Sequence, residues 1–154
     1  MAGRRNRGSS ESGFTLIEVL IVFAIIAILT AILIPAMGFA TDRSKQMATM
    51  SDMRNLAGAI MQYSIDNSGY PNDSLTAQQL AALLSDYAGD GLQYQDRWFH
   101  DFGYESDGNN AYTIQSFGRD GLDGANIDFD TRYDFNLDIV FDTTQFTYSP
   151  EPYE

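Results

Sequence analysis

The sequence predicts an α+β fold in which the second half of one long N-terminal helix packs against a small antiparallel sheet. Three observations predict it. An apolar run of 26 residues begins at Phe14 and is long enough to span a membrane. A helical apolar stripe then continues to about residue 68, and short alternating segments separated by Gly and Asp follow. A chain of 154 residues has room for one modest domain beside such a helix.

The charge and the composition exclude several classes of protein. The chain has 9 basic and 21 acidic side chains, a net charge of −12 and no cysteine. Without cysteine there is no disulfide framework, no thiol chemistry and no cysteine-bound zinc. Residues 1–85 hold 6 basic and 6 acidic side chains, whereas residues 86–154 hold 3 basic and 15 acidic. Because a nucleic-acid-binding protein needs a basic face, we expect no nucleic-acid partner.

The first forty residues divide into a polar leader and an apolar span. Residues 1–13 carry three arginines, and residues 14–39 have only Thr15, Glu18 and Thr30 as polar side chains. As a helix this span is about 39 Å long, against roughly 30 Å for the hydrocarbon core of a bilayer. The rest of the chain is too small to surround it, so we expect residues 14–39 to cross a membrane.

The direction of insertion follows from the basic leader. Positive residues beside a span stay in the cytoplasm, so the C-terminal part should face outward. A secretory signal peptide is the alternative, but its apolar region is usually shorter and a small-x-small cleavage site follows it. Here Pro35-Ala36-Met37-Gly38 fits such a site poorly. We therefore expect the segment to be retained.

Glu18 is an anomaly within this span. A carboxylate in a bilayer-spanning helix is costly, with insertion scales giving about 2.5–3.5 kcal/mol for a comparable aspartate. Two interpretations remain open. Glu18 is solvated near the membrane interface, or a positive charge elsewhere neutralises it.

The residues around Glu18 resemble a known motif. Gly13-Phe14-Thr15-Leu16-Ile17-Glu18-Val19-Leu20 is similar to the processing motif of type IV prepilins and type II secretion pseudopilins. The resemblance implies that a membrane-embedded prepilin peptidase cuts between Gly13 and Phe14 and methylates the Phe14 amine. It also implies that Glu18 meets the Phe14 amine of a neighbouring subunit in a filament.

The helix should continue beyond the membrane through residues 40–69. Proline removes a helical hydrogen bond, so we expect a kink or local unwinding at residues 31–35. An apolar stripe at helical spacing then marks the face that packs on a sheet, and Asn67-Ser68-Gly69 indicates the end of the helix. The stripe contains Met50, Met53, Leu56, Ala57 and Ile60. Residues 60–71 also resemble the segment in which major pseudopilins end their long helix, which implies a pilin-like fold.

The outward domain, residues 70–154, should hold a second helix and two or three strands. Thr76 and Gln79 form a capping-box pattern for a helix that Gly89 ends. Alternation predicts strands at residues 111–117 and 134–141, with a short edge piece at 146–148. Residues 90–102 read as a loop whose Asp96-Arg97-Trp98 resembles a segment of the pseudopilin family.

A dense group of Asp and Gly lies at residues 116–138. Several carboxylates on glycine turns suit Ca²⁺, which takes six to eight oxygen ligands, although a solvated acidic loop is the alternative. The loop resembles the calcium loop of major pseudopilins, which implies ligands from the Phe117 carbonyl and Asp120. Asp123 is a further candidate. The second arm stays ambiguous, since Asp128 matches on spacing and Asp138 matches the closing Asp-Ile pair.

Catalysis has little support in the sequence. The single histidine, His100, lies in a loop where a surface or packing role is expected, and no phosphate-binding glycine loop precedes an apolar helix. We therefore expect no enzyme.

The resemblance implies a subunit of the periplasmic pseudopilus of a type II secretion system. Its partners would be other copies of itself, the prepilin peptidase, an inner-membrane assembly platform and minor pseudopilins. The chain would cross the bacterial inner membrane once, with its N-terminus in the cytoplasm. A type IV pilin of a surface fibre is the main alternative, although such pilins usually carry a C-terminal disulfide. A membrane-anchored, calcium-dependent binding module is a third possibility.

Overall fold

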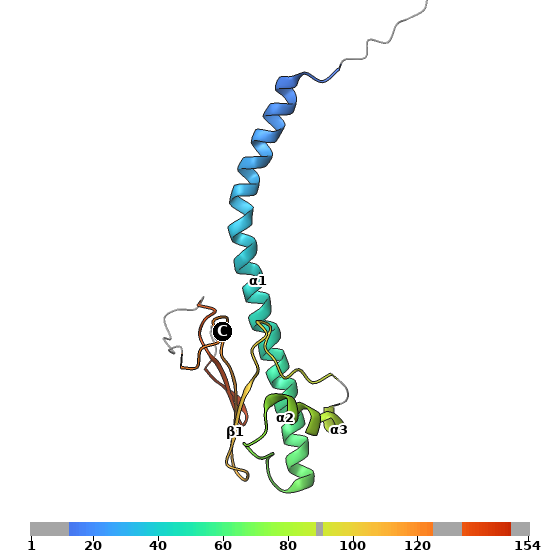
Figure 1. Cartoon of the computed structure of the whole chain (residues 1–154), viewed down its shortest axis with the longest axis vertical. Coiled ribbons are helices and arrows are strands. Elements are labelled where there is room, and N and C mark those ends of the chain that lie inside the picture. The colour runs from blue at the N-terminus through green and yellow to red at the C-terminus, as the bar shows by residue number, and fades with distance from the viewer. Residues whose placement is uncertain (1–12, 89–90, 125–133, 149–154) are drawn as a thin grey trace, which may run out of the picture. The chain divides into compact units, whose positions relative to one another are not determined.

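The computed structural model describes residues 13–88, 91–124 and 134–148, with only the backbone of residues 35 and 36. Two compact units are present, residues 1–39 and 40–154, and α1 contributes to both (Figure 1). The predicted α+β fold is confirmed. The elements of the described residues are α1 (Leu16–Asn67), α2 (Ala77–Leu83), α3 (Ser85–Ala88), β1 (Gly103–Ser106), β2 (Tyr112–Ser116), β3 (Ile139–Asp142) and β4 (Gln145–Tyr148).

The backbone of α1 is helical through residues 31–35, so the expectation of local unwinding there is wrong. A proline costs one hydrogen bond, but Ser and Thr side chains can satisfy carbonyls in an apolar helix. In the turn before Pro35, the Thr30 hydroxyl donates to the Ile26 carbonyl at 2.7 Å. The helix ends where predicted, because Ser68 has a left-handed backbone (φ 58°) and the flexible Gly69 follows.

The second helix begins at the predicted cap. The Thr76 side chain accepts from the Gln79 backbone N–H, and the Gln79 side chain accepts from the Thr76 backbone N–H. The helix is shorter than expected, because α2 ends at Leu83 and a separate turn, α3, follows. Leu84 is fully buried with ψ near 0°.

The sheet is an antiparallel meander in the order β1-β2-β3-β4. Tyr104 pairs with Ile114, and Ile114 pairs with Phe141. A register shift between Val140 and Phe141 separates the two halves of the β3–β4 pairing. The strand at 112–116 and the edge strand at 145–148 lie where the sequence predicted them. Strand β1 was not predicted from the sequence.

The predicted strand at 134–141 is wrong in its first half. Strand β3 begins only at Ile139, and residues 134–138 form a turn. The Asp134 carboxylate accepts from the Asn136 backbone N–H at 3.0 Å. The Arg119 backbone N–H donates to the Phe135 carbonyl at 2.7 Å. Asp side chains commonly close such turns. The alternation of apolar and polar residues therefore arose from a turn that buries both Phe135 and Asp138.

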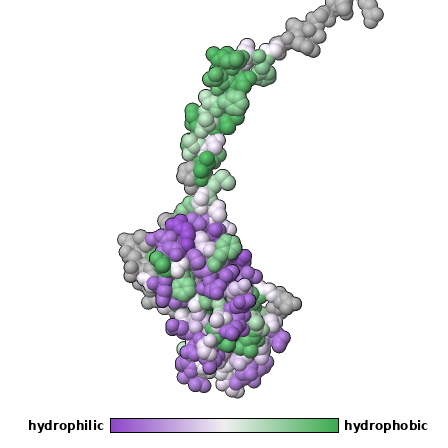
Figure 2. Space-filling model, in the orientation of Figure 1, coloured by the Kyte–Doolittle hydropathy of each residue, from purple (hydrophilic) through white to green (hydrophobic). Residues whose placement is uncertain are grey.

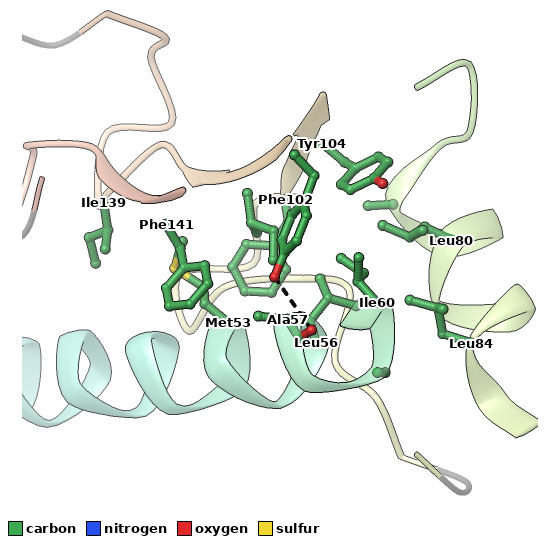
Figure 3. Close-up of a cluster of buried hydrophobic side chains, with 14 of the residues drawn as sticks. Met53, Leu56, Ala57, Ile60, Leu80, Leu84, Phe102, Tyr104, Ile139 and Phe141 are labelled. Carbon is green, nitrogen blue, oxygen red and sulfur yellow. Dashed lines mark hydrogen bonds between the residues drawn. The ribbon is translucent and has the colours of Figure 1, made fainter. Parts of the chain in front are cut away.

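The core lies where the sheet and α2 meet one face of α1 (Figure 3). The predicted Met-rich stripe supplies that face, since Met53 and Ile60 are completely buried. The Tyr112 hydroxyl donates to the Ala57 carbonyl at 3.5 Å, which ties the central strand β2 to the helix. Burying apolar surface is the main driving force here. The sheet is thereby held on residues 50–60 of α1, and the loops that follow its strands are fixed relative to that helix.

Candidate functional site

The first candidate site is the start of α1. Gly13 and Phe14 precede the helix, and the Phe14 side chain is 84% exposed. Thr15 and Glu18 form a reciprocal capping arrangement. The Glu18 carboxylate accepts from both the backbone N–H and the hydroxyl of Thr15, each at 2.8 Å. The Glu18 backbone N–H donates to the Thr15 hydroxyl at 3.3 Å. The carboxylate is therefore held against the first turn of its own helix.

Sequence reasoning missed this role of Thr15. The signal was present, because Thr-x-x-Glu is the same capping pattern that predicted the start of α2 at Thr76 and Gln79. The two donors from Thr15 satisfy part of the hydrogen-bonding capacity of Glu18. They do not neutralise its charge.

The apolar span follows directly. Among the described residues, α1 is the one helix long and apolar enough to cross a membrane. Every described side chain from residue 14 to residue 34 is exposed, and Figure 2 shows hydrophobic side chains covering this part of the helix. An apolar surface of this extent marks contact with a membrane or a partner.

The second candidate site is the acidic loop, residues 117–124, which is built on left-handed glycines. Gly118, Gly121 and Gly124 have φ values of 62°, 68° and 79°. A Cβ on Gly118 would lie 2.8 Å from the Leu137 carbonyl oxygen, and one on Gly121 would lie 2.7 Å from Nε2 of His100. Only glycine fits these two positions, because both the backbone angle and the space exclude a side chain. The loop therefore has a defined shape.

Asp138 lies beneath this loop and is almost completely buried. Its Oδ2 atom accepts from the Gly124 backbone N–H at 3.0 Å and from Nε2 of Gln115 at 2.9 Å. Its Oδ1 atom is buried and has no hydrogen-bond partner within the described part of the chain. Burial raises the pKa of Asp138, and the charges of Asp123 and Asp120 add to that rise, while the two hydrogen bonds oppose it. A buried, partnerless carboxylate oxygen is costly unless something compensates it.

The structure brings together some of the predicted metal ligands. Nε2 of Gln115 also donates to Asp123 at 3.1 Å, so this amide bridges Asp123 and Asp138. Asp120 is exposed and accepts from the Leu122 backbone N–H, and the Phe117 carbonyl accepts from Gly121. Within the described ranges no three acidic or histidine side chains form a ready metal-binding group. Asp128 lies outside the described residues.

A buried carboxylate organises the turn at residues 96–101. Oδ1 of Asp96 accepts from the backbone N–H groups of Trp98 and His100, both at 2.9 Å, and Oδ2 accepts from the Ser116 hydroxyl at 2.8 Å. Nδ1 of His100 lies 2.9 Å from the Gly118 carbonyl oxygen. The packing role expected for His100 is confirmed, because its ring fills the space beside the two loop glycines.

Two ion pairs attach this region to α1. Arg119, beside Asp120, contacts Asp42 at 3.1 Å. Arg97 contacts the buried Asp52 at 2.8 Å. Burial raises the pKa of Asp52, and the Arg97 guanidinium offsets only part of that rise. The acidic loop and the 96–101 turn are thus fastened to the helix at residues 42–52.

Comparisons with known proteins follow the same division of the chain. The family model for type II secretion system (T2SS), protein G matches residues 37–131, and the model for the prokaryotic N-terminal methylation motif matches residues 8–34. The chain is 32% identical over 127 residues to the type II secretion system core protein G of Pseudomonas aeruginosa, covering 74% of this chain and 87% of that protein. The corresponding protein of Klebsiella michiganensis is 33% identical over 135 residues, covering 79% and 93%. No solved structure matches the chain significantly.

We expect Gly118→Ala to destabilise a soluble fragment of residues 40–154 by about 2–4 kcal/mol, since it combines backbone strain with a backbone clash. Thermal unfolding measures the change. Gly108→Ala is the matched control, because Gly108 has a φ of 78° but a Cβ there meets nothing within 4 Å. It should cost only about 1–2 kcal/mol. Equal losses in the two variants would contradict the packing described for the loop.

Proposed function

Because the chain belongs to the type II secretion system protein G family, we propose that it is cut between Gly13 and Phe14 and then assembles through Glu18 with other copies of itself. The family membership itself establishes the general role of the chain. The chain is a structural, non-enzymatic pseudopilin subunit of a type II secretion system, anchored by its N-terminal apolar helix. It also favours the pseudopilus over the surface fibre of a type IV pilin.

The arrangement at Glu18 is the observation that carries the proposal. Thr15 holds the carboxylate by two hydrogen bonds but leaves its charge uncompensated. Cleavage after Gly13 would create a positive amine on Phe14, four residues from Glu18. In an apolar environment an unpaired charge is strongly unfavourable, and pairing with an amine of a neighbouring copy removes that cost. The pairing would also set the axial register between copies.

The proposed topology follows from the leader. Arg4, Arg5 and Arg7 keep residues 1–13 in the cytoplasm, residues 14–39 cross the inner membrane, and residues 40–154 fold in the periplasm. The cleavage site then lies at the cytoplasmic membrane surface, within reach of a membrane-embedded prepilin peptidase. Extraction of the span into a filament requires an inner-membrane assembly platform, and minor pseudopilins would share the filament.

We also propose that the acidic loop binds calcium. The support comes from Asp138, whose buried Oδ1 atom has no partner among the described residues and whose neighbours Asp120 and Asp123 are both negative. A hard cation would satisfy that oxygen and offset the repulsion. The described residues supply four candidate ligands: the Phe117 carbonyl, Asp120, Asp123 and Asp138. Asp128 remains a candidate from the second arm.

Gly13→Ala should block processing. The expected result is that the intact chain keeps residues 1–13, seen by mass spectrometry of the membrane fraction, whereas the unaltered chain loses them and gains one methyl group. Gly38→Ala is the control, because it is the same substitution at a glycine within α1, away from the processing site, and a Cβ there meets nothing within 4 Å. A Gly13→Ala chain with the mature mass would exclude this processing site.

Two substitutions separate charge pairing from helix capping at Glu18. Glu18→Gln keeps a side chain that suits the capping position but removes the charge, and Glu18→Ala removes both. If the charge drives assembly, both variants should insert into the membrane normally and both should fail to form filaments, as seen by electron microscopy of overexpressing cells. Normal filaments from Glu18→Gln would show that capping, and not pairing, is the role of Glu18.

Calcium should raise the melting temperature of the 40–154 fragment, and a chelator should reverse the rise. A ligand at 100 times its dissociation constant adds about 2.7 kcal/mol. Asp138→Asn should abolish the shift, whereas Asp86→Asn, an exposed acid on α3, should leave it unchanged. Absence of any calcium-dependent shift in the unaltered fragment would contradict the metal site.

Without a metal, the stability of the 40–154 fragment should depend on pH through Asp138. The folded-state pKa of Asp138 is raised, so the fold binds this proton more tightly than the unfolded chain does. Its contribution to stability should therefore improve as the pH falls from neutrality through that raised pKa. Asp138→Asn should remove this contribution.

A further inference from the structure

The tip of the 96–101 turn displays an aromatic side chain to solvent. Phe99 is 79% exposed and has a left-handed backbone with φ 72°. Such a conformation is a genuine outlier for a bulky residue and persists only where the surroundings impose it. Here they do, because the Phe99 N–H donates to the Asp96 carbonyl at 3.1 Å and the Asp96 carboxylate holds the N–H groups on both sides.

The surroundings of Phe99 are apolar and acidic. The neighbouring His100 contacts Gly121, and the residue after that glycine, Leu122, is 64% exposed. Asp101 is exposed, and its carboxylate accepts a hydrogen bond from Gln95 at 2.8 Å. The turn therefore presents a rigid apolar anchor beside a negative charge. Anchors of this kind dominate the energy of protein interfaces.

A hollow on α1 adjoins this turn, because Asp52, which lines the hollow, is the ion-pair partner of Arg97 in the turn. It has a volume of about 430 Å³, and we call it the Gly58 groove. Gly58 is exposed on α1 and opens space above the helix, since a Cβ there would meet nothing within 4 Å. Exposed Met61 and Ile65 follow at helical spacing. The lining residues are Asp52, Arg54, Asn55, Gly58, Ala59, Tyr87, Ala88, Gly91, Leu92 and Gln93.

The groove offers a positive charge that could meet the negative charge of Asp101. Arg54 is exposed, and its guanidinium stacks 4.8 Å above the Phe146 ring. The other charged lining residue, Asp52, is already paired with Arg97. An acidic group approaching the groove would thus meet Arg54. Asp101, two residues from Phe99, is such a group.

We propose that Phe99 of one copy inserts into the Gly58 groove of a second copy, with Asp101 approaching Arg54. Phe99 and the groove are different features of one chain, so the contact between copies is heterologous, and a heterologous contact builds an open filament where its rotation does not close a ring. The inference therefore rests on the proposed self-assembly, which requires the open case. It adds a contact between periplasmic units to the one proposed at Glu18.

The absence of cysteine in the sequence permits a direct test. The cysteines are placed beside the contact so that Phe99, Asp101 and Gly58 stay intact. Leu122→Cys is exposed next to Gly121, which adjoins His100 of the turn, and Asn55→Cys is exposed on the wall of the groove. The two variants are coexpressed as full-length proteins, filaments are isolated, and a short bis-maleimide is added. The expected product is a covalent dimer of one Leu122→Cys and one Asn55→Cys chain, identified by mass spectrometry. Met47→Cys replaces Asn55→Cys in the control, since Met47 is exposed on α1 but outside the groove, and should give no dimer with Leu122→Cys.

The outcomes separate this contact from the proposed function. Filaments that form without the Leu122–Asn55 dimer would overturn the contact and leave self-assembly intact. So would a dimer that forms equally with Met47→Cys, or linkage of Leu122→Cys to a different protein. If the unaltered chain forms no filaments, self-assembly itself fails. As a second measure, Phe99→Ala should lower filament yield several-fold, while the 40–154 fragment of that variant should keep its melting temperature.

Discussion

The fold of residues 40–154 depends on the hydrogen bonds that the buried Asp96 carboxylate accepts. It closes the 96–101 turn through two backbone N–H groups and joins that turn to β2 through Ser116. With the turn in place, the His100 ring lies against the acidic loop, where only glycine can accept it. Hydrogen bonds to a buried charged group are among the stronger ones, and leaving such a group unpaired is costly. Loop, strand and turn are consequently positioned together.

The excess of acid in the C-terminal half has a local physical meaning. Two basic residues fasten loops to the helix, Arg119 through Asp42 and Arg97 through Asp52. In the described part of the chain, Asp120 and Asp123 of the 117–124 loop form no ion pair with a basic side chain, and their charges act on Asp138. A site short of positive charge beside a partnerless carboxylate oxygen is a place where a cation would stabilise the fold.

The two parts of α1 serve different environments with one regular backbone. At residues 16–34 and 37–39 its apolar side chains are exposed, which suits lipid or other helices. From Met50 to Ile60 its apolar side chains face the sheet instead and form the core. In the proposed assembly, a glutamate at the start of the first part and an exposed groove on the second part would supply two separate contacts between copies. The contact at Glu18 would act through charge pairing in an apolar environment, and the contact at the Gly58 groove through shape complementarity at a solvent-exposed surface.

Local sequence determined the features that depend on near neighbours. The long helix, its end at Ser68, the cap at Thr76 and the strand around Ile114 were all predicted, because spacing and capping act over a few residues. Tertiary structure alone decided the rest. It placed the break between the second and third helices at Leu84 and made residues 134–138 a turn rather than a strand. It also brought Gln115 to Asp123 and Asp138, which happens only after β2 and β3 pair. Such contacts join residues far apart in the chain, and no local pattern encodes them.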